Sequence, residues 1–324
     1  MRYLWRRTIH GLFLLVGVSL LSFLLLEMAP GDYFAEMRLN PQISPETVAA
    51  LRARYGLDRP LPERYARWLR SVAAGEWGYS FAYASPVGPL LRDRALHTLA
   101  LAGSATLLAW LIAIPLGVRW AAARPGRWPD RLWAAITSAG LATPDLLVAM
   151  GLLLLAVRTG ALPTGGLTSP GFDDLGSLGK ARDLAAHAVL PVAALVVGML
   201  PVLVRHVRAS MVEALASPFA RAARGHGIPR GRLLFRHALP AAAPPLASLV
   251  GFSVASLLSS SLLVEVVMSW PGLGPLLLES ILARDVYVVV GAVQASTLVL
   301  LAGNLVADLL LYGADPRIRR EGLS

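Results

Sequence analysis

EALASPFARAARGHGIPRGRLLFRHALP, residues 213–240, is a short, polar and basic stretch between two long apolar segments, and it organises the rest of the chain. Ser217 is a favoured residue for capping a helix, and Pro218 suits the first helical position. Gly227 tolerates the left-handed conformation that ends helices, and Pro229 prevents continuation. The pattern therefore predicts a short rigid helix, fixed at both ends, over residues 218–227 on a membrane surface.

The composition indicates a polytopic membrane protein. Of the 324 residues, 56% are hydrophobic and only 15% are charged, whereas about a quarter of a soluble domain is charged. The net charge of +10 comes almost wholly from arginine, because Lys180 is the only lysine. In a membrane protein such an excess more often marks cytoplasmic loops than nucleic-acid binding. The sequence has no cysteine, which excludes disulfides, thiolate catalysis and cysteine-ligated metals.

Six stretches are long and apolar enough to cross a bilayer, which takes about 20 residues. They are residues 9–29, 97–118, 132–157, 187–206, 240–267 and 287–311. The first run is too long for the core of a secretory signal, so we interpret it as a retained span. The sequence thus predicts an all-α membrane protein with six transmembrane helices.

The expected domain organisation follows from these spans. We expect residues 1–29 to form an N-terminal tail and the first helix, residues 30–95 an extracytoplasmic region, residues 96–313 the membrane core, and residues 314–324 a cytoplasmic tail. A helix is expected to begin at Pro45 and Glu46 in the extracytoplasmic region. Arginines gather in the loops 119–131 and 207–239 and near both ends of the chain, which predicts that both termini are cytoplasmic.

The stretch 213–240 resembles the coupling loop of ABC-importer permeases. That family has Glu-Ala-Ala, three residues, Gly, nine residues, Ile, one residue and Leu-Pro. The matching positions are Arg221, Ala222, Ala223, Gly227, His237, Leu239 and Pro240. The first and the fifth of these depart from the pattern in the way seen in the peptide-importer branch.

Further motifs, in order along nearly the whole chain, are similar to the dipeptide/oligopeptide permease branch of that family. They are Pro30-Gly31-Asp32, Gly56-Leu57-Asp58-Arg59-Pro60-Leu61, Gly78-Tyr79-Ser80, Glu265 with Trp270-Pro271-Gly272-Leu273-Gly274, Ala283-Arg284-Asp285, Asn304 with Asp308, and Asp315-Pro316-Arg317. Each motif alone is weak, and their order and spacing together are specific.

The resemblance implies a type I ABC-importer permease fold in a bacterial inner membrane, with an extracytoplasmic subdomain between the first two spans. It implies import of di- or oligopeptides driven by ATP, with a second homologous permease, two cytoplasmic ATPase subunits and an extracytoplasmic binding protein as partners. It assigns ATPase coupling to residues of the loop: Arg221, Ala222, Ala223, Gly227, Leu239 and Pro240. The chain itself would be no enzyme and would hold no cofactor or metal, with ATP bound by its partners.

The residues themselves leave the energy source open. The sequence has no Gly-x-x-x-x-Gly-Lys-Ser/Thr phosphate loop, so energy must come from another chain or from an ion gradient. It also has no His-Glu-x-x-His or Gly-x-Ser-x-Gly motif of a metalloprotease or a serine hydrolase.

Ionisable residues inside spans are candidates for function because they are costly there. Asp145 follows Pro144 in the third span and either lines a path that favours cationic groups or pairs with a neighbouring helix. Ser256, Ser260 and Glu265 are the other candidates for a substrate path, and the alternative for the serines is hydrogen bonding between helices.

Two alternative functions remain. The same scaffold serves importers of nickel, opines or other small solutes. In a different class, an ion-gradient-driven secondary transporter would use Asp145 as its coupling carboxylate.

Overall fold

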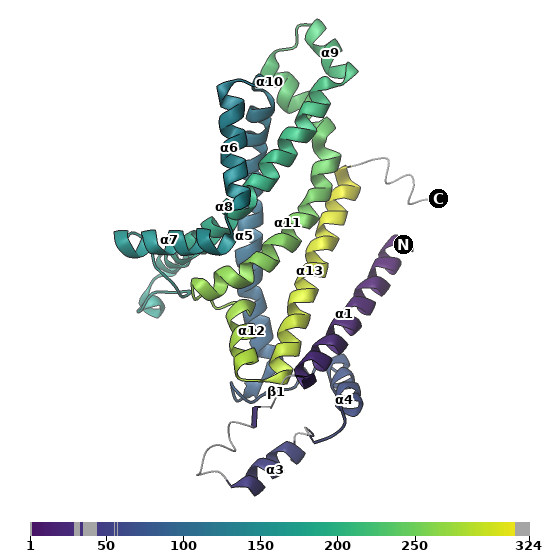
Figure 1. The fold of residues 1–324 in the computed structure, drawn as a ribbon, viewed down its shortest axis with the longest axis vertical. Coiled ribbons are helices and arrows are strands. Elements are labelled where there is room, and N and C mark those ends of the chain that lie inside the picture. Colours follow the sequence, from purple (N-terminus) through teal and green to yellow (C-terminus); the bar gives the residue numbers. More distant parts are fainter. Residues whose placement is uncertain (1, 29–32, 35–43, 55, 57, 315–324) are drawn as a thin grey trace. The chain divides into compact units, whose positions relative to one another are not determined.

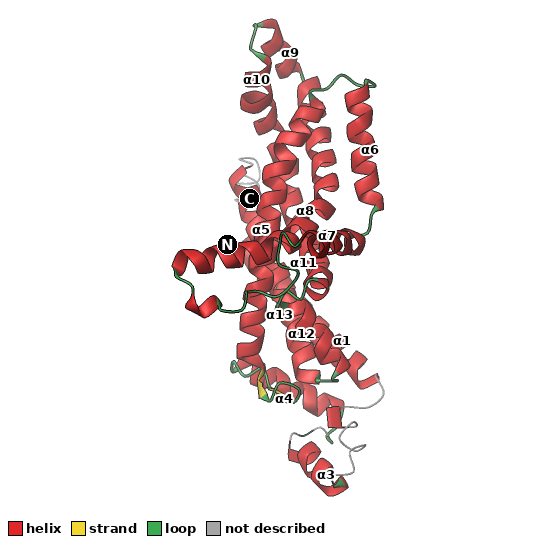
Figure 2. Ribbon diagram, turned by 90° about the vertical axis from the view of Figure 1, so that its left-hand side faces the viewer, coloured by secondary structure: helices red, strands yellow, loops and turns green. Residues whose placement is uncertain are grey.

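A computed structural model describes residues 2–28, 33–34, 44–54, 56 and 58–314 of the chain (Figures 1 and 2). Among these residues, five helices are long and apolar enough to cross a membrane, and a bent helix pair raises the number to six if it forms one span. The predicted all-α membrane protein is therefore confirmed. The motif at Pro30-Gly31-Asp32 and the tail 315–324 lie outside the described residues.

The chain divides into two compact units, residues 1–98 with 271–301 and residues 99–270 with 302–324. In the first unit, α1 (Arg2–Met28) packs against α4 (Leu61–Ala73) through the aromatic side chains of Phe23, Tyr65 and Trp68. Arg64 of α4 donates to the Glu27 carboxylate of α1 at 2.9 Å. Aromatic packing and an ion pair thus fix the first apolar helix to α4.

The first unit also contains the helix α3 (Pro45–Arg54) and a small hairpin. The helix α3 begins where the sequence predicts. Strands β1 (Tyr79–Ser80) and β2 (Ser85–Pro86) pair antiparallel, with Tyr79 opposite Pro86. The hairpin leads into α5 (Val87–Ala121), whose first turns belong to this unit together with α12 (Leu273–Leu282) and most of α13 (Val286–Ala314).

The second unit is built around α8 (Ser177–Ala216), which packs against α6 (Trp128–Ala142), α7 (Asp145–Thr159) and α11 (Leu239–Val267). A helix of 40 residues is about 60 Å long, about twice the hydrocarbon core of a bilayer. It therefore extends well beyond the predicted span 187–206. A short 3₁₀ helix (Phe172–Asp174) precedes it.

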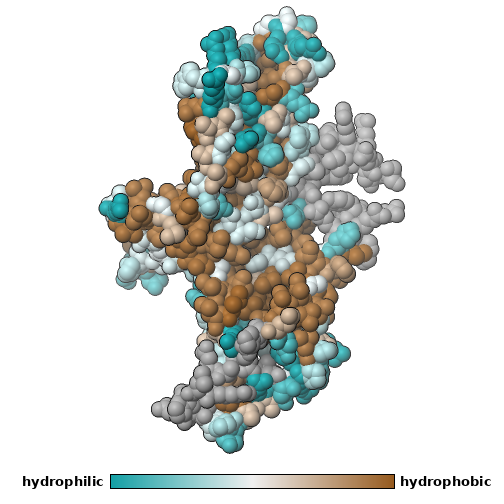
Figure 3. Space-filling view, in the orientation of Figure 1, coloured by the Kyte–Doolittle hydropathy of each residue, from teal (hydrophilic) through white to brown (hydrophobic). Residues whose placement is uncertain are grey.

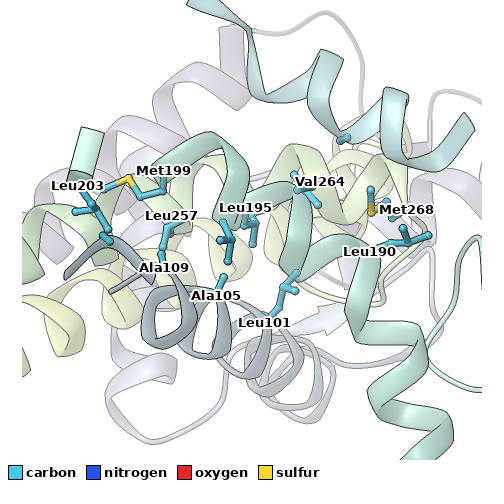
Figure 4. Packing of buried hydrophobic residues seen from close by; sticks show 14 of the residues in the cluster. Leu101, Ala105, Ala109, Leu190, Leu195, Met199, Leu203, Leu257, Val264 and Met268 are labelled. Carbon is cyan, nitrogen blue, oxygen red and sulfur yellow. The ribbon is translucent and has the colours of Figure 1, made fainter. Parts of the chain in front are cut away.

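One long cluster of buried side chains forms the core of the second unit (Figure 4). Small residues of α5, Ala105 and Ala109, lie against the leucines and the methionine of α8, such as Leu195 and Met199. Leu257 of α11 completes the contact. The alanines have no bulk beyond Cβ, so they allow the helices to approach closely.

The third predicted span, 132–157, is not the continuous helix that we expected. It consists of α6 and α7, whose axes differ by 97° across the break between them. Thr143 is extended, with φ −91° and ψ 118°, as residues before proline usually are. Pro144 also lacks the backbone N–H that a continuous helix would need. The break places Asp145 in the first turn of α7.

The long helices and the loops differ in the polarity of their surfaces. Apolar side chains cover α7 and much of the exposed helical surface, while hydrophilic side chains gather around α9 (Pro218–Gly225) and α10 (Arg230–Arg232) (Figure 3). Exposed leucines on α7, such as Leu147 at 57% and Leu155 at 58%, fit a lipid or protein neighbour better than water.

Candidate functional site

The helix α9 is capped at both ends as the sequence predicts. The Ser217 hydroxyl accepts a hydrogen bond from the Ala220 N–H at 3.4 Å, and Pro218 is the first helical residue. At the other end Gly227 has φ +73°, and the N–H of Ile228 donates to the Ala223 carbonyl at 3.2 Å. This is the Schellman pattern of a helix that glycine ends.

One face of α9 is anchored and the other is free. Ala220 is fully buried, whereas Arg221 and Ala222 are exposed and Ala223 is partly exposed. The anchor includes a residue that the sequence analysis missed. The Arg224 guanidinium donates to the Leu215 carbonyl at 2.5 Å and to the Ala220 carbonyl at 3.2 Å. The predicted coupling residues 221–223 therefore remain accessible on a helix that is tied to the end of α8.

The other two predicted coupling residues lie on a different element. Leu239 and Pro240 begin α11, after a π-helical segment (Leu233–Ala238) that follows α10. Ala238 is fully buried beside them. The structure thus places residues 221–223 on α9 and Gly227 in the turn that ends it, whereas the Leu-Pro pair lies at the start of the next apolar helix.

Asp130 fastens the loop between α5 and α6 to α8 in the same part of the unit. Its Oδ1 accepts from the Trp120 indole N–H at 2.8 Å and from Arg208 at 2.9 Å, and its Oδ2 accepts from the Gly126 N–H at 2.9 Å. The Arg208 guanidinium also lies 4.5 Å from the centre of the Trp120 ring. Arg230 reaches the same loop through the Ala122 carbonyl. These contacts hold the surroundings of α9 in one arrangement.

Three of the four candidates for a substrate path line one cavity. Asp145, Ser256 and Ser260 border a space of about 200 Å³ between α6, α7, α8 and α11. The Ser260 hydroxyl donates to Asp145 Oδ2 at 2.6 Å. The fourth candidate, Glu265, is fully buried elsewhere on α11 and does not border this cavity.

The serines of α11 divide by role. Ser253 is fully buried and accepts from the Trp110 indole N–H at 3.2 Å, so it joins α11 to α5. Ser261 is also buried and donates to the Leu258 carbonyl. Ser256 and Ser260, four positions apart on one helical face, border the cavity instead.

Two motifs that are far apart in the sequence, Gly78-Tyr79-Ser80 and Ala283-Arg284-Asp285, meet in the first unit. The fully buried Asp285 accepts through Oδ2 from the Ser80 hydroxyl at 2.7 Å and from the N–H groups of Phe81 and Ala82 at 2.8 and 3.1 Å. Both motifs were visible in the sequence, but their pairing was not, because it spans 205 positions.

Tyr83 and Glu279 add a second link, which joins the hairpin to α12. The Tyr83 hydroxyl donates to the Glu279 carboxylate. Burial, followed by this hydrogen bond and the negative charge, raises the pKa of Tyr83 to about 12. The phenol therefore stays protonated and donating at any physiological pH.

No group of three or more histidine, aspartate or glutamate side chains that could hold a metal ion occurs within the described ranges. Among the described residues, the exposed helix α9 and the polar cavity beside α7 hold the predicted site residues that the structure brings together.

Known proteins match nearly the whole chain. Residues 113–320 match the family described as "Binding-protein-dependent transport system inner membrane component", and residues 1–102 match its N-terminal counterpart. The oligopeptide transport system permease protein AppB of Bacillus subtilis is 33% identical over 98% of both chains. The dipeptide transport system permease protein DppB of Escherichia coli is 34% identical over 94% of this chain and 95% of its own.

Two further comparisons extend this result. The glutathione transport system permease protein GsiC of Salmonella paratyphi A is 31% identical over 98% of this chain and 99% of its own. In structure, the MetNI methionine ABC transporter matches with a TM-score of 0.52, 21% identity and coverage of 71% of this chain and 95% of its own, which shows the fold. The chain therefore belongs to the binding-protein-dependent transport system inner membrane components, as a non-catalytic, multi-pass permease subunit of an ABC importer.

Proposed function

We propose that this permease belongs to an importer of di- or oligopeptides, driven by ATP hydrolysis on partner subunits. The names of three relatives support the peptide assignment, since they refer to oligopeptides, dipeptides and glutathione, and glutathione is itself a small peptide. The family membership decides against the ion-gradient alternative, because its members work with a binding protein in an ABC importer.

The observation that carries the mechanism is the exposed face of α9 at the end of α8. Arg221 and Ala222 are accessible, and Gly227 and Ser217 fix the two ends of the helix. The small side chains of Ala222 and Ala223 would allow this helix to approach a groove on another protein closely. We assign that groove to an ATPase subunit, which Arg221, Ala222, Ala223 and Gly227 would engage, while Leu239 and Pro240 set the direction in which α11 leaves the loop.

The motion that this contact transmits follows from the bond between α9 and α8. When ATP binding draws two ATPase subunits together, α9 moves with the subunit that holds it. Because Arg224 ties α9 to Leu215, the displacement passes into α8 rather than into a flexible loop. The long helix α8 borders the Asp145 cavity through Leu195, Gly198 and Met199. A tilt of α8 would therefore change the cavity near the middle of the membrane.

The partners in this proposal are a second homologous permease, two cytoplasmic ATPases and an extracytoplasmic binding protein. The arginines around α9 support a cytoplasmic location for this loop and for both termini. The hairpin and the helices α3 and α4 would then face the binding protein.

The substrate class is tested by transport in vesicles. The chain, its companion permease, the ATPases and the binding protein of the same gene cluster are purified together and reconstituted. We expect uptake of labelled Ala-Ala or Ala-Ala-Ala that requires both ATP and the binding protein. Uptake of another solute such as nickel with neither peptide transported would refute the peptide assignment and leave the importer class intact.

The role of α9 is tested by Gly227→Val. A Cβ at this glycine would meet no atom within 4 Å, so the substitution creates no clash. The φ of +73° instead costs a non-glycine residue about 1–2 kcal/mol, which loosens the end of the helix. We expect normal membrane insertion and loss of the ATPase stimulation that the binding protein causes.

The matched control is Gly225→Ala in the same helix. Gly225 has no positive φ and no atom near its Cβ position, and alanine favours a helix. Stimulation should therefore persist in this variant. Normal stimulation in Gly227→Val would show that the capped end of α9 has no part in coupling.

A further inference from the structure

A partly open cavity with a polar wall lies in the apolar second unit. Its volume is about 200 Å³, and its wall carries one carboxylate and three hydroxyl groups, from Asp145, Thr143, Ser256 and Ser260. Leu195, Met199 and Leu257 supply apolar surface. A space of this size is larger than a water molecule needs and smaller than the roughly 300–1,000 Å³ of complete small-molecule sites.

The Asp145 carboxylate has spare capacity to accept hydrogen bonds. Its Oδ2 accepts one bond, from Ser260, whereas an ionised carboxylate can accept about four. The position of Oδ1 depends on Gly198 of α8, because a Cβ there would lie only 2.3 Å from this oxygen. The chain thus has a glycine at a position on α8 where a side chain would displace the carboxylate.

The hydroxyl of Ser256 is also available. Within the described part of the chain it makes no hydrogen bond, whereas the neighbouring Thr143 hydroxyl donates to the Ala139 carbonyl at 2.9 Å. A carboxylate with free acceptor capacity and an unengaged hydroxyl therefore face the same space.

The negative charge lacks a cationic partner in the cavity. None of the residues that line it is an arginine, lysine or histidine. The N-terminal end of α7 offsets part of the charge, because a helix N-terminus carries roughly half a positive charge. An ionised group in a transmembrane segment is costly, so a bound cation would complete the neutralisation that Ser260 and the helix begin.

We infer that this cavity binds an ammonium group of the transported solute as it passes the middle of the membrane. This inference rests on the proposed peptide function, since a peptide brings an ammonium at its N-terminus and, in some sequences, on a lysine side chain. The limited volume holds one end of a peptide and not the whole of it. Asp145 takes the charge, and Ser256 accepts a further hydrogen bond from the ammonium.

The charge preference of the cavity can be measured without any peptide. Because the chain has no cysteine, Ser256→Cys introduces a single thiol on this chain, in the cavity wall. Its reaction rates with cationic aminoethyl and anionic sulfonatoethyl methanethiosulfonate are compared in the assembled importer. The control is Ser177→Cys, an exposed position at the start of α8.

We expect the cation-to-anion rate ratio of the Ser256→Cys thiol to exceed that of the control thiol about tenfold, the factor that corresponds to about 1.4 kcal/mol. In the Asp145→Asn background, which keeps an acceptor for Ser260, the preference should vanish. Gly198→Ala, which displaces the carboxylate, should have the same effect. This variant replaces Asp145→Asn in the experiment if the Asp145→Asn protein does not accumulate in the membrane. An equal ratio at both sites, or no reaction with either reagent, would overturn the inference.

Uptake then identifies the source of the ammonium. Wild type and Asp145→Asn are compared for Ala-Ala, Ala-Lys and N-acetyl-Ala-Ala, with Asp174→Asn, an exposed carboxylate, as the control. A loss of about tenfold for the first two peptides alone assigns the N-terminus, and a loss for Ala-Lys alone assigns the side chain. An equal loss, or no loss, for all three would overturn the inference. If wild type transports no peptide, the proposed function fails, and the thiol measurement still decides whether the cavity selects cations.

Discussion

Asp285 holds the hairpin 79–86 in place, and its removal should release that hairpin. Asp285→Ala strands three donors, the Ser80 hydroxyl and the N–H groups of Phe81 and Ala82, which now bond at 2.7, 2.8 and 3.1 Å. A buried donor left unsatisfied costs about 1–3 kcal/mol. Three donors at the lower limit give about 3 kcal/mol, although neighbouring effects do not add simply.

Hydrogen exchange of the two amides measures this release directly. At about 1.4 kcal/mol for each factor of ten, a local loss of about 3 kcal/mol speeds exchange of the Phe81 and Ala82 amides by about 100-fold. The measurement is mass spectrometry of the peptide that contains the hairpin, from the complete importer in lipid nanodiscs. Exchange in α3 should not change, which separates local release from general unfolding.

Two milder variants act as controls for the same site. Asp285→Asn keeps an oxygen that can accept from the backbone amides, so we expect a smaller acceleration, of about tenfold. Ser80→Ala removes one donor and also strands the Tyr83 N–H, which bonds to the Ser80 hydroxyl at 3.0 Å. Unchanged exchange in Asp285→Ala would show that the carboxylate does not hold the hairpin, and would refute the reasoning.

Three further changes test other contacts. Arg224→Ala removes the tie between α9 and α8 and should lower the solute transported per ATP several-fold, as measured in vesicles. Gly117→Ala places a Cβ 2.5 Å from the Val207 side chain and should destabilise the chain by about 1–3 kcal/mol, measured as a lower thermal midpoint. Tyr83→Phe removes the donor to Glu279. The loss of stability relative to wild type should be constant below about pH 10 and should disappear as the pH approaches about 12. The reason is that a raised pKa contributes stability only while the phenol is protonated.

Each of these has its own control. Arg224→Lys retains a donor and should restore part of the coupling, whereas equal coupling in all three proteins would contradict the tie. Gly103→Ala, in the same helix as Gly117, adds a Cβ with no atom within 4 Å and should leave the midpoint unchanged or raise it. A deficit of Tyr83→Phe that disappears already near neutral pH would contradict the raised pKa.

The sequence by itself determined the features that depend on neighbouring residues. Apolar runs of about 20 residues identified the spans. In lipid, a single segment can satisfy its own backbone hydrogen bonds only as a helix, so such runs are predicted to be helical. Ser217 and Gly227 fixed the ends of α9 in advance, since capping bonds connect residues only a few positions apart.

The tertiary structure alone decided how distant parts meet. Pro144 is one of several prolines in apolar segments, yet α8 continues through Pro191 while the chain bends by 97° at Pro144. Only the folded structure shows which of these prolines interrupts its helix. Ser260 reaches Asp145 across 115 positions, and Ser80 reaches Asp285 across 205. Such bonds depend on how whole helices pack, and that packing is not encoded in the local spacing of residues.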